Sequence, residues 1–305
     1  MPASPARVQM RQDLLDAGLL IDTGVDGLYG RSGTFEDIVD AIDGLVIAAG
    51  AGEGYARMRF APVIPRPAFE KTDYLASFPD LIGSIHTFVG DDKDHAALLA
   101  THAAGGDWTE ALVPSEVMLV SAACHPLYPG LAGRPLPEGG SKYDVQSYCF
   151  RHEPSLEPTR LQAFRQHEYV LVGTPDDAIA HRDLWVARGL DILKQLELDV
   201  VDEVANDPFF GRAGRMLKAN QINQALKIEL VVDVYGDGGG GVACVSSNCH
   251  QDHFGVNFAI TTADGEVAHS ACVGFGLERI ALALLAAHGL DPAAWPSSVR
   301  DRLWP

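Results

Sequence analysis

The sequence of 305 residues is short of positive charge: 23 Lys and Arg stand against 41 Asp and Glu, for a net charge of −18. A surface this acidic repels phosphate backbones, which argues against a general nucleic-acid-binding protein. Long hydrophobic runs are also missing, and the longest, residues 280–287, is too short to span a bilayer. The N-terminal residues lack the apolar segment of a signal peptide. These absences predict a soluble cytoplasmic protein with no membrane partner.

Cysteine is scarce as well, with an odd number of five residues between positions 124 and 272. Five scattered cysteines do not make a disulfide framework, so we expect a reducing compartment in which some thiols are free or bind metal. Hydrophobic residues make up 47% of the chain and charged residues 21%. That composition is enough to bury a substantial core and excludes a disordered chain.

Hydrophobic spacing predicts an antiparallel α+β domain, because most strands come in hairpins with helices inserted between them. The expected helices cover residues 35–49, with Thr34 as N-cap, and about 178–198 and 276–288. The expected strands are 55–64, 84–90, 112–120, 150–153, 164–172, 227–235, 242–247, 254–261 and 266–273, with a loop over 126–142. The glycine-rich residues 236–241 lack a following Lys-Ser/Thr, so a hairpin turn is favoured over a phosphate cradle.

Arginines beside polar turns give the first functional signal. Arg151 lies in Phe-Arg-His-Glu at the entry of a polar loop, Arg160 and Phe164 follow at its exit, and Arg279 lies where the last long helix begins. One guanidinium group can bind two phosphate oxygens at once, and a helix N-terminus favours an anion. An arginine and an aromatic ring can stack on the two faces of a purine. One such arginine alone would more often pair with a surface carboxylate, but three in ordered motifs favour a nucleotide.

These motifs resemble those of class II aminoacyl-tRNA synthetases. Residues 150–164 (Phe-Arg-x-Glu, a loop, then Arg-x-x-x-Phe) resemble motif 2, and residues 274–279 (Gly-x-Gly-x-x-Arg) resemble motif 3. The helix 35–49 and the strand that ends at Pro65 are compatible with motif 1, the dimer-forming element. The resemblance implies an antiparallel sheet flanked by helices, a homodimer, and a single catalytic domain over residues 31–305 after an N-terminal extension of residues 1–30.

Two further segments are similar to seryl-tRNA synthetases. Residues 245–252 (Val-Ser-Ser-Asn-Cys-x-x-Asp) are similar to their Ser-Asn stretch, which makes Asn248 a substrate-contact candidate. Residues 119–127 resemble the Thr-x-Glu segment that holds the amino group of the substrate, except that Cys124 stands in place of the glutamate.

This departure indicates a metal site. Two thiolates and a carboxylate make a three-ligand zinc site with one open position, and Cys124, Glu168 and Cys272 supply them. Their spacing alone would favour buried structural cysteines. The resemblance to atypical zinc-dependent archaeal seryl-tRNA synthetases, however, implies a Cys/Glu/Cys zinc that grips the amino group. A rival set of ligands is Cys244, Cys249, His250 and His253, whereas Cys149 is interpreted as a core residue.

In combining this zinc site with a short N-terminus, the chain resembles the amino acid:[carrier protein] ligases. Seryl-tRNA synthetases carry a large N-terminal tRNA-binding domain, and here about thirty residues precede the catalytic pattern. Members of the resembled family activate glycine or alanine and load it on the phosphopantetheine thiol of a small acidic carrier protein. We therefore expect glycine, or alanine, as substrate, such a carrier as partner, and no tRNA.

The resemblance also implies individual roles in ATP binding. Arg151 would clamp the α-phosphate, Glu153 would accept from the adenine amino group, and Phe164 and Arg279 would stack on the ring. Arg160 and Arg279 would hold the γ-phosphate. Magnesium should accompany ATP, with Glu229 as a candidate ligand.

A basic helix face is the hypothesised docking site for the acidic carrier. Its members recur at three-residue spacing: Arg212, Arg215 and Lys218. Two alternatives to the ligase remain open. One is a seryl-like aminoacyl-tRNA synthetase, and the other is a catalytically silent synthetase-like module that binds a nucleotide or a partner.

Overall fold

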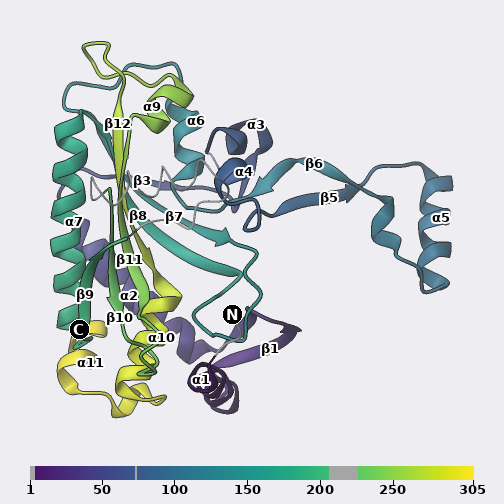
Figure 1. Ribbon diagram of the computed structural model, residues 1–305, viewed down its shortest axis with the longest axis horizontal. Coiled ribbons are helices and arrows are strands. Elements are labelled where there is room, and N and C mark those ends of the chain that lie inside the picture. Colours follow the sequence, from purple (N-terminus) through teal and green to yellow (C-terminus); the bar gives the residue numbers. More distant parts are fainter. Residues whose placement is uncertain (1–3, 73, 206–225) are drawn as a thin grey trace.

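The computed structural model describes residues 4–72, 74–205 and 226–305. A seven-stranded sheet in the order β3-β7-β8-β12-β11-β10-β9 forms its centre (Figure 1). Every neighbouring pair is antiparallel except β3 and β7, which are parallel. The strands are β3 (Ala56–Arg59), β7 (Ser141–Phe150), β8 (Ala163–Gly173), β9 (Val200–Val204), β10 (Lys227–Val232), β11 (Val242–Gln251) and β12 (His269–Gly276).

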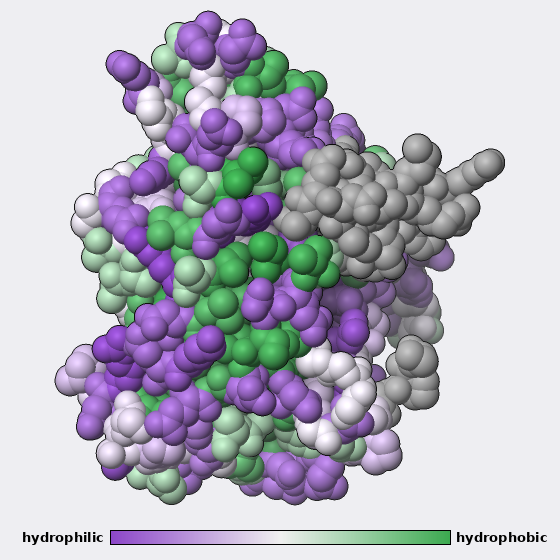
Figure 2. Space-filling model, turned by 60° about the vertical axis from the view of Figure 1, so that its left-hand side comes forward, coloured by the Kyte–Doolittle hydropathy of each residue, from purple (hydrophilic) through white to green (hydrophobic). Residues whose placement is uncertain are grey.

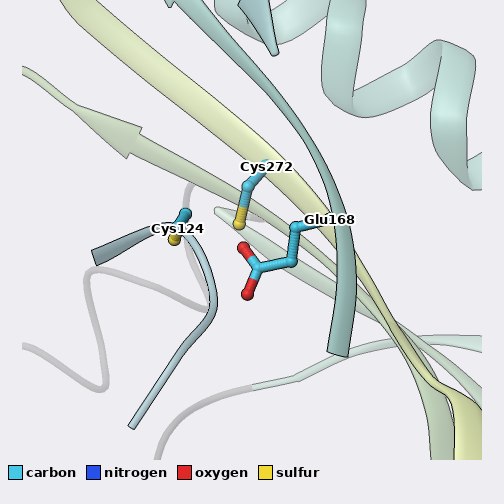
Figure 3. A group of neighbouring side chains, drawn as sticks. All are labelled: Cys124, Glu168 and Cys272. Carbon is cyan, nitrogen blue, oxygen red and sulfur yellow. The ribbon is translucent and has the colours of Figure 1, made fainter. Parts of the chain in front are cut away.

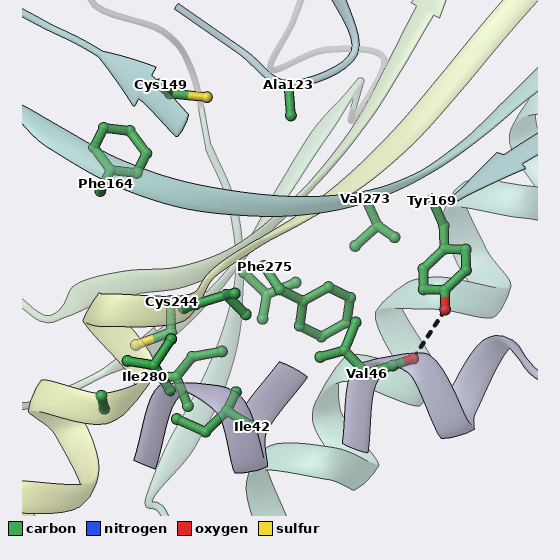
Figure 4. Packing of buried hydrophobic residues seen from close by; sticks show 14 of the residues in the cluster. Ile42, Val46, Ala123, Cys149, Phe164, Tyr169, Cys244, Val273, Phe275 and Ile280 are labelled. Carbon is green, nitrogen blue, oxygen red and sulfur yellow. Dashed lines mark hydrogen bonds between the residues drawn. The ribbon is translucent and has the colours of Figure 1, made fainter. Parts of the chain in front are cut away.

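Three long helices cover one face of this sheet: α2 (Gly33–Gly50), α7 (Pro175–Gln195) and α10 (Leu277–His288). In α2, Phe35, Ile38, Ile42 and Val46 follow helical spacing and are all fully buried. Figure 4 shows Ile42 and Val46 packed below the sheet with Phe275 of β12, and the Tyr169 hydroxyl of β8 donates to the Val46 carbonyl oxygen at 3.0 Å. The opposite face of the sheet, which carries Phe164 and Cys149, is therefore left for the site.

Close packing between α2 and β8 makes Gly50 sensitive to substitution. A Cβ at Gly50 would overlap the ring of Tyr169, whereas a Cβ at Gly44 of the same helix would meet nothing within 4 Å. Gly50→Ala should therefore lower the free energy of unfolding by about 1–3 kcal/mol through overpacking. Gly44→Ala, the matched control, should raise it by up to about 1 kcal/mol because alanine is the better helix former. Urea denaturation followed by circular dichroism measures both, and equal effects at the two positions would contradict this packing.

Smaller elements surround the main sheet. At the N-terminus, α1 (Pro5–Asp16) is followed by the hairpin of β1 (Leu20–Val25) and β2 (Leu28–Arg31). A three-stranded sheet of β4 (Val63–Pro65), β6 (Leu112–Leu119) and β5 (Ser84–Phe88) projects from the body and carries α5 (Asp92–Ala103) at its tip (Figure 1). The short helices are α3 (Arg66–Phe69), α4 (Tyr74–Ser77), α6 (Tyr128–Leu131), α9 (His253–Phe258) and α11 (Ser297–Leu303), and single 3-10 turns cover Glu70–Thr72, Trp108–Ala111, His125–Leu127 and Pro292–Ala294.

The N-terminal elements share the hydrophobic cluster of the main body. Leu14, Leu19, Leu20 and Tyr29 are buried in the same cluster as the residues of α2 and α10. A domain division at residue 31 stays a prediction. In the described part of the chain, no helix combines the length and the hydropathy needed to cross a membrane.

Hydrophobic surface is also present on the side of α7 and β9. Figure 2 brings this side forward and shows hydrophobic residues gathered in a band across its middle. Ile179 and Leu184 of α7 and Val201 and Val204 of β9 are among the exposed hydrophobic side chains.

The α+β fold and most of the expected elements are confirmed, and five local predictions are wrong. The expected strand 150–153 is not a strand beyond Phe150, where β7 ends, because the backbone N–H of His152 donates to the Leu81 carbonyl oxygen of a turn rather than to a neighbouring strand. The N-cap of α2 is Ser32 rather than Thr34, because the Ser32 side chain accepts from the backbone N–H of Phe35. The expected strand 55–64 is divided between β3 and β4, which belong to different sheets. Residues 254–261 begin as helix α9 instead of a strand, and the expected loop 126–142 contains α6.

Candidate functional site

The expected metal ligands meet on the face of the sheet that the long helices leave uncovered. Glu168 lies on β8 and Cys272 on the neighbouring β12, while Cys124 follows β6 at the start of a 3-10 turn. One ligand atom from each lies within 4.8 Å of the other two. Figure 3 shows the three side chains pointing toward one another, and all three are buried. Residues from three separate parts of the chain thus form one cluster, which we call the Cys-Glu-Cys cluster.

Only one of the two carboxylate oxygens of Glu168 accepts a backbone hydrogen bond. The backbone N–H of Ala123 donates to Glu168 Oε1 at 2.9 Å. The other oxygen, Oε2, is buried without a hydrogen-bond partner in the part of the chain that the structure describes. A buried carboxylate oxygen of this kind carries a large desolvation cost unless a cation or donor meets it.

The pKa values of the Cys-Glu-Cys cluster all move toward the neutral forms. Hydrogen bonding with Cys272 and burial raise the pKa of Cys124 well above its usual value. Hydrogen bonding with Cys124 favours the Cys272 thiolate, but burial and the charge of Glu168 outweigh it and raise that pKa. Burial likewise raises the pKa of Glu168. A divalent cation reverses this balance, and two thiolates with one carboxylate are donors that suit zinc.

A second layer of polar groups supports Cys272. His250 Nε2 lies 3.4 Å from the Cys272 sulfur, and His250 Nδ1 lies 2.9 Å from the Ser270 hydroxyl. The Asn248 side-chain amide lies 3.9 Å from the same sulfur. From the sequence, His250 is expected only as a rival ligand, although its alternation with Asn248 on one strand places both residues on the site face. Outer-layer groups of this type orient metal ligands.

The rival ligands are not brought together. Cys249 packs in a small separate cluster with Leu171, Ala178 and Ala271. The Cys244 sulfur lies 3.9 Å from the Arg279 carbonyl oxygen, and His253 contacts Asn257. Cys149 is buried on β7, as expected, and its thiol donates to Gln166 Oε1 at 3.1 Å. Among the described residues, the Cys-Glu-Cys cluster is the group placed to hold a metal ion.

The two glycines of motif 3 lie on the sheet face between Cys272 and Arg279. Gly274 is paired with Glu168 on β8 and with Ser246 on β11, so it lies between two side chains of the same sheet face. Gly276 follows on that face two residues later. The two glycines of motif 3 therefore keep the sheet surface open between Cys272 and Arg279.

Arg151 lies at the edge of this surface, directly after β7 ends. Its Nε donates to the Ser121 carbonyl oxygen at 3.2 Å, and its guanidinium lies 5.4 Å from the centre of the Phe164 ring. Arg151 is thus the arginine whose guanidinium lies over the Phe164 ring. The expected stacking of Arg279 on an adenine beside Phe164 stays a prediction.

Arg160 and Glu153 face each other across the motif 2 loop. Arg160 Nη1 donates to Glu153 Oε1 at 3.1 Å, and Arg160 Nε donates to Glu157 Oε2 at 3.2 Å. The Arg160 side chain is 50% exposed. This exposure leaves the guanidinium accessible to a ligand.

Arg279 is held by two backbone carbonyl groups. Its Nε donates to the Thr159 oxygen and its Nη1 to the Ala243 oxygen, each at 3.1 Å. Burial and the nearby charge of Arg151 lower the pKa of Arg279. The positive charges of Arg151 and Arg279 repel each other, and a polyanion such as a triphosphate would relieve that repulsion.

The remaining candidates are less directly connected to the cluster. Glu229 of β10 is opposite Ser246 and forms an ion pair with Lys227 at 3.0 Å. The expected docking set Arg212, Arg215 and Lys218 lies outside the described residues.

Comparisons with known proteins agree with this geometry. No protein-family model matches the chain. Two proteins of Bradyrhizobium diazoefficiens, amino acid–[acyl-carrier-protein] ligases 1 and 2, are 42% and 43% identical to it, over 99% and 95% of this chain and 94% and 87% of their own lengths. The type-2 serine–tRNA ligase of Methanopyrus kandleri is 27% identical over 65% of this chain and 40% of that protein.

Solved structures establish the fold. The seryl-tRNA synthetase of M. kandleri, in complex with tRNASec of A. aeolicus, superposes with a TM-score of 0.83 at 20% identity. That match covers 96% of this chain and 60% of the synthetase chain. The seryl-tRNA synthetase of Pyrococcus horikoshii complexed with ATP gives a TM-score of 0.68 at 14% identity, over 96% of this chain and 62% of its own. The chain has the class II aminoacyl-tRNA synthetase fold and, by its similarity to the two Bradyrhizobium proteins, belongs to the amino acid–[acyl-carrier-protein] ligase family.

Proposed function

We propose that this protein activates a small amino acid with ATP and transfers it to the phosphopantetheine thiol of an acidic carrier protein. One observation carries the proposal: the buried Cys-Glu-Cys cluster shares its sheet face with Phe164, whose ring Arg151 contacts, and with Gly276, beside which the side chain of Arg279 lies. The cluster suits the binding of an amino group, and the arginines suit the binding of a nucleotide. Family membership supports the carrier protein as acceptor.

Amino-acid binding falls to the cluster and its surroundings. A zinc ion held by Cys124, Glu168 and Cys272 would supply an open coordination position for the neutral amino group. The Ala123 N–H fixes the Glu168 carboxylate, and Asn248 approaches from the neighbouring strand. Gly274 leaves room for the substrate carboxylate to extend toward the arginines. We propose glycine ahead of alanine as the substrate.

Adenylate formation falls to the arginines. The carboxylate oxygen of the amino acid attacks the α-phosphorus of ATP, pyrophosphate leaves, and Arg151 stabilises the charge on the α-phosphate. Glu153 would accept from the adenine amino group, Phe164 would stack on the ring, and Arg160 and Arg279 would bind the γ-phosphate. Magnesium bound with ATP would neutralise pyrophosphate, and Glu229 is the proposed protein ligand.

Transfer needs a nucleophile from outside the chain. The thiolate of the carrier attacks the carbonyl carbon of the adenylate, a thioester forms and AMP leaves. We also propose that the enzyme is a homodimer and that Arg212, Arg215 and Lys218 contact the acidic carrier.

The test is amino-acid-dependent exchange of pyrophosphate into ATP, with glycine, alanine and serine, on protein assayed for bound zinc. We expect exchange with glycine or alanine and none with serine. A second assay follows radiolabelled amino acid onto a carrier protein with and without its phosphopantetheine arm, and only the form with the arm should be labelled. Exchange with serine followed by loading of tRNA would instead indicate a synthetase. A folded, zinc-loaded protein without exchange would contradict the proposal.

A further inference from the structure

The N-terminal helix reaches the motif 2 loop through one side chain. Arg7 of α1 donates from Nη1 to Glu157 Oε2 at 2.8 Å and from Nε to Asp237 Oδ2 at 3.0 Å. Its guanidinium also lies 4.8 Å from the centre of the Tyr235 ring. The exposed fractions of the Arg7, Glu157 and Asp237 side chains are only 16%, 9% and 12%. This mostly buried ion-pair network joins α1, the motif 2 loop and the turn between β10 and β11.

Glu157 is also connected by hydrogen bonds to two arginines of the proposed nucleotide site. Its Oε2 also accepts from Arg160 Nε at 3.2 Å, and its Oε1 accepts from the Thr159 hydroxyl at 3.1 Å. The carbonyl oxygen of Thr159 in turn accepts from Arg279 Nε. The Glu157 carboxylate therefore contacts Arg160 directly and is connected to Arg279 through Thr159.

The β1–β2 hairpin supports the same loop at its base. The backbone N–H of Gln162 donates to the Gly27 carbonyl oxygen at 2.8 Å, and its side-chain amide donates to the Asp26 carbonyl oxygen at 2.7 Å. A Cβ at Gly27 would lie 2.9 Å from the Arg160 carbonyl oxygen and 3.3 Å from that of Glu153. The motif 2 loop is thus held at both its base and its middle by the first thirty-one residues.

We propose that Arg7 is a positioning residue for ATP, which acts through Glu157 on Arg160 and Arg279. The proposal rests on the proposed function, because it assigns those two arginines to the nucleotide. Without Arg7, Glu157 loses the cation that compensates its burial, and the loop must order itself when ATP binds. Ordering at that moment weakens binding. Arg151 is held by Ser121 instead, so the α-phosphate contact should persist.

The test compares Arg7→Ala with Arg11→Ala in the full chain. Arg11 lies one turn further along α1, and its recorded partners, Tyr29 and Asp22, belong to the N-terminal elements. Arg7→Ala should raise the KM for ATP about tenfold, which corresponds to about 1.4 kcal/mol. The KM for the amino acid should stay within about twofold and kcat within about threefold of wild type. Arg11→Ala should leave the KM for ATP unchanged.

A second variant and a second readout guard against a folding defect. Glu157→Gln leaves α1 intact and should weaken ATP binding to the same extent. The double variant with Arg7→Ala should be no worse than either single one, because both act through one contact. Arg7→Lys should restore part of the affinity, since lysine keeps the charge but not the two-sided fork.

Calorimetric titration with ATP alone, together with protease sensitivity of residues 153–162, separates this proposal from the function it rests on. Weaker ATP binding and faster loop cleavage in Arg7→Ala support it even when no amino acid is activated. Unchanged ATP affinity in Arg7→Ala would overturn it, as would equal effects of Arg7→Ala and Arg11→Ala.

Discussion

Cys272→Ser should remove bound metal from the protein and lower amino-acid-dependent pyrophosphate exchange by about a thousandfold, equivalent to about 4 kcal/mol of transition-state stabilisation. A serine hydroxyl keeps the volume of the side chain but does not ionise as a thiol does, so it is a poor zinc ligand. Glu168→Gln should act in the same direction, because the amide lacks the negative charge. In the proposed mechanism, loss of the ion leaves the amino group unfixed, so the carboxylate is no longer directed at ATP.

Metal content by mass spectrometry and exchange kinetics test this result together. Cys249→Ser is the matched control, since Cys249 is also buried but packs in the separate small cluster away from Glu168. It should keep about one zinc per chain and near-normal exchange. Cys272→Ser protein that still carries one zinc and exchanges normally would refute the assignment of the Cys-Glu-Cys cluster.

Arg151→Ala should lower the rate of exchange by a factor on the order of a hundred to a thousand, the usual effect of removing a preorganised donor to a developing charge. Bound zinc should be unaffected, because Arg151 is not one of the three proposed ligands and donates to the Ser121 carbonyl oxygen. Arg151→Lys should recover only part of the rate, as lysine lacks the planar fork that matches phosphate oxygens.

The control for Arg151 is Arg57→Ala, at an exposed position on the edge strand β3. It changes net charge equally and should leave exchange unchanged. Steady-state exchange at saturating ATP gives the comparison. A variant of Arg151 that keeps full kcat would mean that another group stabilises the α-phosphate.

Local pattern predicted the elements of the fold wherever one periodicity was clear. In α2 the buried positions repeat at helical spacing, so the helix was evident without any partner. The segment after Tyr55 has no such guide: β3 pairs with β7 in the main sheet, while β4 pairs with β6 in the small one. Alternation identifies a strand but does not say which sheet the strand joins.

Helix α9 is a segment in which the sequence pattern predicts the wrong type of element, a strand instead of a helix. Phe254 and Phe258 lie four residues apart in an apolar segment that also suits a strand. The Phe254 ring stacks on Tyr128 at 3.8 Å between centroids, so a partner more than a hundred residues away decides the conformation. Tertiary contacts override local preference at such positions.

The residues of the site also divide into those that a local sequence motif predicts and those that only the fold brings together. Arginine motifs are contiguous, so sequence alone indicated a nucleotide. The Cys-Glu-Cys cluster is predicted only through the family resemblance, because intervals of 44 and 104 residues carry no ligand signature. The contact between Arg7 and Glu157 spans 150 positions and follows no local pattern. Only the folded chain reveals it.

The absence of any loop between β12 and α10 has a consequence for chain length. Strand β12 ends at Gly276 and the helix begins at Leu277, so seven positions join Cys272 to Arg279 without slack. An inserted or deleted residue in the strand would turn Cys272 toward the helical layer, because side chains alternate between faces. Nor can a neighbouring turn absorb the change. In the function that we propose, this interval fixes the separation between the residue that binds the amino end of one substrate and the residue that binds the phosphates of the other, so it should tolerate substitution far better than a change in its length.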